Sequence, residues 1–124
     1  MAIPEESDGM EHDLMVSSSR ARSSATFPIA TPRESLPALI SEVVRTSRRF
    51  KLKAATAAAA TLTVGFNWRV WAGVIELSFT PGQGSWTQVE ASWRPTVATT
   101  VLDYGQGARD LRRLYKELLA ASER

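Results

Sequence analysis

The sequence of 124 residues contains no cysteine. This absence excludes disulfide bridges, zinc sites built on thiolates and cysteine nucleophiles, and it fits a reducing compartment. Histidine occurs once, at His12, in a stretch that we expect to be disordered. Because a histidine-based metal site and a Ser-His-Asp triad both need a histidine inside the fold, we expect neither. The sequence therefore predicts no metal and no cofactor.

A long apolar run is also missing. The longest apolar stretch, Ala54–Phe66, is too short to span a bilayer and carries three threonines, and Asn67 and Arg69 interrupt its continuation. Residues 1–16 are acidic and lack the apolar segment of a secretory signal. We therefore expect a cytoplasmic protein with no membrane partner.

Acidic and basic residues are unevenly distributed. Residues 1–30 hold five acids and two bases, whereas residues 31–124 hold thirteen bases and eight acids, and the net charge is +2. The first thirty residues are also rich in serine, so they bury too little apolar surface to offset the entropy of ordering them. We predict a disordered leader over residues 1–30 and a single domain over residues 31–124. The acidic leader is either solvated or folded back over a basic face.

A helix is predicted at the start of the domain. It begins at Thr31 or at Ser35, and the second choice places Pro37 in the first turn, where its missing amide costs least. It ends near Arg48 or Arg49, where basic residues suit the negative end of the helix dipole. Its apolar face comprises Leu36, Leu39, Ile40, Val43, Val44, Ser47 and Phe50.

A second helix is predicted at the end of the chain. Asp103 and Gln106 form an Asp-x-x-Gln capping box at its start. An apolar stripe at helical spacing follows, consisting of Ala108, Leu111, Leu114, Tyr115, Leu118 and Leu119.

Four stretches between the helices alternate apolar and polar residues, which predicts strands. They are Phe50–Ala54, Thr61–Phe66, Gly73–Phe79 and Trp86–Trp93. The side chains expected to face inward are Phe50, Leu52, Ala54, Leu62, Val64, Phe66, Gly73, Ile75, Leu77, Phe79, Val89, Ala91 and Trp93. Short connections favour an antiparallel meander, and two amphipathic helices need one face to cover. The predicted fold class is α+β, a two-layer domain in which a four-stranded antiparallel meander carries an N-terminal and a C-terminal helix on one face (α-β-β-β-β-α).

From Leu36 onward, the chain resembles a class of small uncharacterised bacterial helix–four-strand–helix domains. The residues that carry the resemblance are Gly73, the turn Asp103–Gln106, and the pair Asp110 and Leu111. In those domains an Asp-aromatic-Gly-Lys/Gln turn caps the last helix. The resemblance implies the fold and no particular activity.

Two carboxylates are the sharpest candidate for chemistry. A five-residue loop over Pro81–Ser85 places Glu76 opposite Glu90 on the outer face of the sheet, and directly opposed carboxylates occur in acid–base pairs. A register two residues shorter places Glu76 opposite Gln88 instead. The alternative is that both carboxylates are solvated or neutralised by nearby bases. These two carboxylates and Tyr104 are the only candidate catalytic residues that we find in the sequence. We therefore expect a protein that is not an enzyme.

Two basic clusters offer a different surface. One lies at the first helix–strand junction and comprises Arg45, Arg48, Arg49, Lys51 and Lys53. The other lines the last helix and comprises Arg109, Arg112, Arg113 and Lys116. Such clusters bind phosphate backbones, so nucleic-acid or polyanion binding at the junction is an alternative function, and solubilising charge is the simpler interpretation.

Exposed aromatic residues favour partners or ligands. Trp68, Trp71 and Trp86 are expected at loop or strand ends, whereas Trp93 is expected in the core. We predict a binding or interaction module that self-associates or takes a protein partner through the outer sheet face and the tryptophan loop. The expected contact residues are Trp68, Arg69, Trp71, Trp86, Glu76 and Glu90. A carrier of a small apolar ligand, with its pocket between helices and sheet, is a further alternative.

Overall fold

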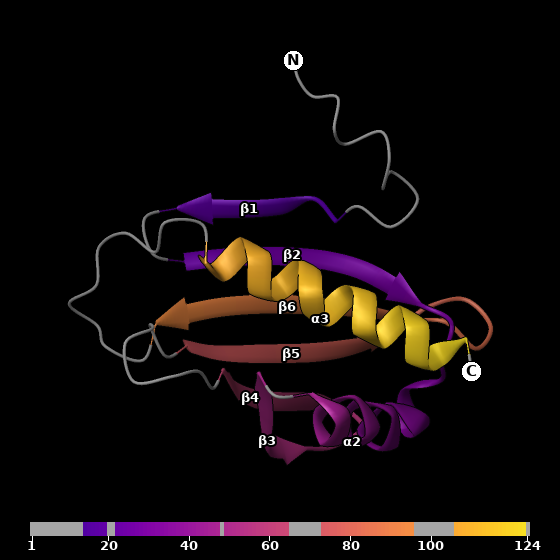
Figure 1. The fold of residues 1–124 in the computed structure, drawn as a ribbon. Helices are drawn as coiled ribbons and strands as arrows, with labels where there is room; N and C mark the ends of the chain where they lie inside the picture. The colour runs from indigo at the N-terminus through magenta and orange to yellow at the C-terminus, as the bar shows by residue number, and fades with distance from the viewer. Residues whose placement is uncertain (1–13, 20–21, 48, 65–72, 96–105, 124) are drawn as a thin grey trace.

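In a computed structural model, the chain forms one antiparallel sheet of six strands with two helices, over the residues that the structure describes (Figure 1). These are residues 14–19, 22–47, 49–64, 73–95 and 106–123. The strands are β1 (Val16–Ser19), β2 (Arg22–Ile29), β3 (Phe50–Ala55), β4 (Ala59–Val64), β5 (Gly73–Pro81) and β6 (Thr87–Pro95). A short 3-10 helix (Arg33–Ser35) leads into α2 (Leu36–Thr46), and α3 (Gln106–Ser122) ends the described chain. Across the sheet the strand order is β1-β2-β6-β5-β4-β3.

The predicted four-stranded meander is wrong, because residues 14–30 contribute two more strands. β2 pairs with β6 from Ser23 opposite Trp93 to Ile29 opposite Thr87, and β1 pairs with the first half of β2. Leu14 and Phe27 are buried in the core. The predicted disorder is therefore wrong for residues 14–19 and 22–30. Residues 1–13 lie outside the described residues.

Small side chains in β2 explain why its sequence pointed to disorder. Ser23 and Ala25 are buried together with the larger apolar residues of the strand, and the residues between them are exposed, so the strand alternates strictly. Pro28 is tolerated because β1 pairs only with residues 22–25, which leaves one side of β2 unpaired at the proline. The ladder with β6 thus stabilises a strand whose composition alone is weak.

The helix α2 connects two strands of the sheet, so it is not the N-terminal element that the sequence predicted. It carries the chain from β2 to β3 at the far edge. The helix begins after Ser35 with Pro37 in its first turn, as one of the two predicted starts has it. It ends at Thr46, earlier than predicted, because the Ser47 hydroxyl accepts hydrogen bonds from the amides of Arg49 and Phe50 at 3.0 and 3.2 Å and turns the chain into β3.

The core lies between the helices and one face of the sheet, which we call the inner face. In β4, β5 and β6, every residue that was predicted to face inward and that the structure describes is buried. α3 runs across β2 and β6 and α2 lies over β3, so both helices cover the inner face (Figure 1). Leu111, Leu114 and Leu118 of α3 are each 1% exposed, and the ring of Tyr115 meets that of Phe27 edge to face at 4.7 Å. The predicted alternation is therefore confirmed for β4, β5 and β6, whereas in β3 an irregularity between Leu52 and Ala54 leaves Ala54 exposed, contrary to the prediction.

The two extra strands make a prediction about stability. Replacing Phe27, which is 3% exposed and packed under α3, with alanine is expected to lower the free energy of unfolding by about 3–5 kcal/mol. Thr26→Ala, on the exposed side of the same strand, is expected to cost about 1 kcal/mol or less. Urea unfolding of both variants measures the difference. If neither substitution changed the free energy of unfolding, β2 would not be part of the folded domain.

Candidate binding surface on the outer sheet face

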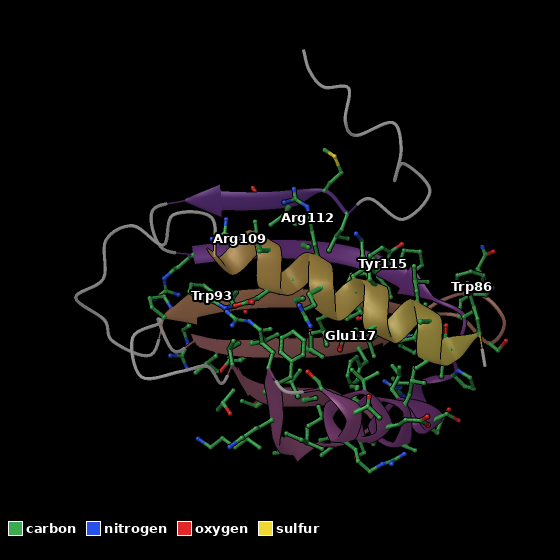
Figure 2. All side chains as sticks on the ribbon, in the orientation of Figure 1. Trp86, Trp93, Arg109, Arg112, Tyr115 and Glu117 are labelled. Atoms are coloured by element: carbon green, nitrogen blue, oxygen red, sulfur yellow. The ribbon has the colours of Figure 1, made fainter. Side chains whose placement is uncertain are left out.

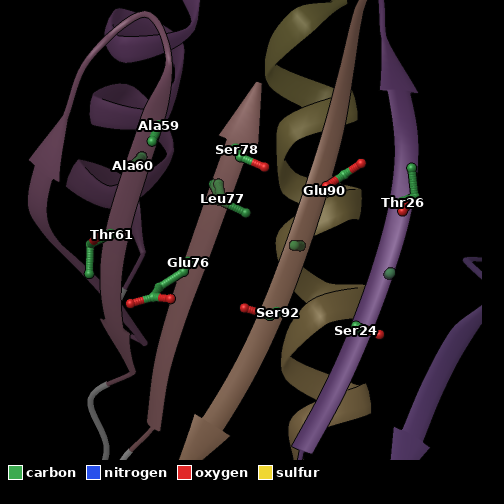
Figure 3. A pocket seen from close by; sticks show the side chains of 12 residues that line it. Ser24, Thr26, Ala59, Ala60, Thr61, Glu76, Leu77, Ser78, Glu90 and Ser92 are labelled. Atoms are coloured by element: carbon green, nitrogen blue, oxygen red, sulfur yellow. The ribbon is translucent and has the colours of Figure 1, made fainter. Parts of the chain in front are cut away.

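The face of the sheet opposite the helices, which we call the outer face, carries short polar side chains. A hollow of about 670 Å³, the central hollow, crosses β2, β6, β5 and β4 (Figure 3). Its lining residues are Ser24, Ala25, Thr26, Ala59, Ala60, Thr61, Glu76, Leu77, Ser78, Glu90, Ala91 and Ser92. Figure 3 looks onto the outer face, with both helices behind the sheet. The hollow follows from side-chain size, because serine, threonine and alanine leave the backbone of a sheet close to the surface.

The two candidate carboxylates share this hollow but do not face one another. Glu76 lies opposite Ser92, and Glu90 lies opposite Ser78. The register differs from both predicted ones because the five-residue turn runs from Gly82 to Trp86 and not from 81 to 85. Gly84, at a φ of 62°, adopts the left-handed conformation that this turn requires. The predicted direct opposition of the two acids is therefore wrong.

Glu76 has a basic neighbour at one end of the hollow. Its carboxylate lies 3.6 Å from the guanidinium of Arg94, and both side chains are about half exposed. A second hollow of about 310 Å³ continues from this point past Arg22 toward β1. An exposed pair of this kind is worth about 1 kcal/mol or less, so it leaves Glu76 available to a binding partner.

Several predicted site residues fall outside the described residues. These are Arg48, Trp68, Arg69, Trp71 and Asp103, and for Gln106 only the start of α3 at this position is described. The predicted capping box and the tryptophan loop therefore stay predictions. Trp86 is described, and its side chain is 49% exposed in the β5–β6 turn, at the opposite end of the sheet from Trp93 (Figure 2).

At the helix–strand junction, Arg49 of the predicted polyanion site is paired with a carboxylate of the protein itself. The guanidinium of Arg49 donates to both carboxylate oxygens of Asp110, at 2.6 and 3.3 Å, and only 20% of its side chain is exposed. Lys51 pairs with Thr63 and lies on the outer face, whereas Arg45 lies on α2 at the other side of the sheet. The described members of the cluster thus do not form one surface.

Asp110 is a buried polar centre that the sequence analysis did not single out for its chemistry. Its carboxylate also accepts a hydrogen bond of 3.0 Å from the indole nitrogen of Trp93, and the residue is 1% exposed. Gly73 lies against the same indole, where an added Cβ would come within 2.6 Å of the ring. The sequence did contain a signal that Asp110 is buried: it stands four residues before Leu114, and this spacing places both residues on the buried side of α3. Two residues that carried the sequence resemblance, Gly73 and Asp110, therefore meet at Trp93.

The described residues show no arrangement suited to a metal. Within them, no three acidic or histidine side chains gather closely enough to hold an ion. Neither of the two described helices has the length and apolar character needed to cross a bilayer.

No protein-family model matches the sequence, and no curated protein matches it. Solved bacterial structures share the fold. Protein Ms6760 of Mycobacterium smegmatis has a TM-score of 0.57 at 9% identity, with 90% of this chain and 93% of that chain covered. A protein of Rhodobacter sphaeroides has a TM-score of 0.57 at 11% identity, with 87% and 96% covered. A conserved protein of unknown function from Enterococcus faecalis, EF2215, has a TM-score of 0.45 at 6% identity, with 94% and 77% covered.

At such identities the likeness shows the fold alone. The first two structures are similar to this chain over nearly the whole length of both chains. The resemblance to small uncharacterised bacterial domains is supported to that extent. The comparisons indicate no catalysis and no ligand.

The buried carboxylate makes a prediction about stability. Asp110→Ala leaves the guanidinium of Arg49 and the indole N–H of Trp93 without their acceptor, so it is expected to lower the free energy of unfolding by about 2–4 kcal/mol. Glu117→Ala, which breaks the exposed ion pair with Arg113 at 3.2 Å, is the matched control and is expected to cost about 0.5 kcal/mol. Chemical denaturation followed by tryptophan fluorescence compares the two. Equal losses would contradict a structural role for the Asp110 cluster.

Proposed function

We propose that the protein is a non-catalytic binding module that self-associates through the outer face of its sheet. The observation that carries the proposal is the central hollow, a polar concavity of about 670 Å³ on strands whose apolar side chains are already covered by the helices. Five hydroxyl groups line it, and both charged residues that line it, Glu76 and Glu90, are acidic. Such a surface offers a partner hydrogen bonds and negative charge beside apolar contact.

The shape and charge of the hollow restrict what fits it. Two copies related by a two-fold axis would place hollow against hollow, so the surface suits a convex partner instead. A basic partner matches the two carboxylates. The chain itself presents one convex basic surface in α3, whose outward side carries Arg109, Arg112, Arg113 and Lys116. We therefore propose that α3 of one copy lies in the hollow of the next.

The dimensions of the two surfaces support this pairing. The hollow crosses four strands, whose three spacings add to roughly 14 Å, and a helix with its side chains is about 10–12 Å wide. Short side chains on the sheet let the helix approach closely. Because exposed ion pairs contribute little each, the association is expected to be weak and sensitive to salt.

Charge reversal on each surface tests the proposal. The wild-type protein is expected to show a mass that rises from 13.6 kDa with concentration in light scattering between about 10 µM and about 1 mM, the range of weak interfaces. The sheet variant Glu76→Lys/Glu90→Lys and the helix variant Arg113→Gln/Lys116→Gln are each expected to remain near 13.6 kDa. The control Glu34→Lys/Glu123→Lys makes the same change in net charge as the sheet variant at exposed sites outside the hollow, and it is expected to associate like the wild type.

A mixture of the two interface variants gives the decisive result. The helix variant keeps an intact hollow, and the sheet variant keeps an intact α3. An equimolar mixture is therefore expected to form a closed pair of twice 13.6 kDa, although neither variant associates alone. A wild-type mass that does not change with concentration would overturn self-association, and unaltered association of the sheet variant would overturn the use of the outer face.

A further inference from the structure

The outward side of α3 is a basic surface next to the point where the described chain begins. Four bases and Glu117 gather there on the exposed side of the helix, and we call this group the α3 basic surface. Its bases are Arg109, Arg112, Arg113 and Lys116. Arg113 is paired with Glu117 at 3.2 Å, and Figure 2 shows Arg109 and Arg112 on the part of the helix nearest β1. The residues that line this surface are thus four bases and one acid.

Leu14 fixes the start of the described chain against this surface. Its side chain is 6% exposed and belongs to the core, and its carbonyl oxygen accepts a hydrogen bond from the guanidinium of Arg112 at 3.4 Å. The segment before it, residues 1–13, contains five carboxylates and neither lysine nor arginine. These acids are Glu5, Glu6, Asp8, Glu11 and Asp13. A strongly acidic segment is therefore tethered at the edge of a basic surface.

We propose that residues 1–13 are an intramolecular ligand of the α3 basic surface. Seven residues separate Arg109 from Lys116 along the helix, a distance of roughly 10 Å, whereas thirteen residues can extend to roughly 45 Å, so the segment is long enough to cover all four bases. Single exposed ion pairs are weak. A short tether nevertheless holds the acids at an effective concentration of about 1 mM or more, which makes their combined contacts effective.

This occupancy regulates self-association, a consequence that rests on the proposed function. The α3 basic surface is the part of the molecule that we place in the hollow of a second copy. The acidic segment presents carboxylates to the same bases that Glu76 and Glu90 would meet. The segment therefore competes with the partner, and neutralising it frees α3 for association.

The absence of cysteine permits a direct test on the full chain. Ser7→Cys introduces a unique thiol for a nitroxide spin label, and the broadening of backbone amide signals in α3 reports the position of the segment. The measurement is made in the Glu76→Lys/Glu90→Lys background at low concentration, where association through the outer face is removed. Broadening is expected at residues 109–117 and not at the β3–β4 turn, residues 56–58, and it is expected to be lost between about 50 mM and about 500 mM salt.

A variant with an uncharged leader distinguishes binding through charge from the proximity that the covalent tether alone would produce. In this variant the three glutamates of residues 1–13 become glutamine and the two aspartates become asparagine, which keeps the length and removes the charge. The proposal expects the broadening of residues 109–117 to fall to the level seen at high salt. Equal broadening in the acidic and neutral forms would overturn it, since proximity would then come from the tether. Because the readout is intramolecular, it stands or falls independently of self-association.

Discussion

The buried carboxylate of Asp110 is the interaction on which the arrangement of the elements depends. It joins α3 to the indole of Trp93 on β6 and to the guanidinium of Arg49 just before β3. These contacts connect the last helix to the centre and to the far edge of the sheet. A carboxylate in the core is costly unless its partners are in place, so this cluster favours one placement of α3 over others that would bury the same leucines.

Helix placement in turn determines which surfaces remain for binding. Both helices take the inner face, and the lining of the central hollow on the outer face consists mainly of hydroxyls, alanines and two carboxylates. The ion pair with Asp110 removes Arg49 from any phosphate-binding surface, and four other bases lie together on the outward side of α3. The two surfaces that we propose to meet, one concave and acidic and one convex and basic, are thus consequences of how the same core is closed.

The prediction of the fold succeeded where side-chain pattern is a local property. The alternation in β4, β5 and β6 and the helical stripe of α3 each describe one element and one neighbouring layer, so the buried side chains there followed from period alone. It failed at β1 and β2, because their small residues carry little apolar area and because β2 pairs with a strand far along the chain, from Ile29 opposite Thr87 to Ser23 opposite Trp93, while β1 pairs with β2 alone. It failed again at the hairpin register, where a shift of one position in the turn separated Glu76 from Glu90.

By itself, then, the sequence determined which face of β4, β5 and β6 is buried, which side of α3 packs on the sheet and that no cysteine takes part in the chemistry of the chain. Only the tertiary structure decided that residues 16–19 and 22–29 are strands, that α2 is an internal connection and that Arg49 is held by Asp110. The physical reason is the range of the interactions. Periodicity and capping act within one element, whereas strand order, register and ion pairing depend on which distant segments the whole chain brings together.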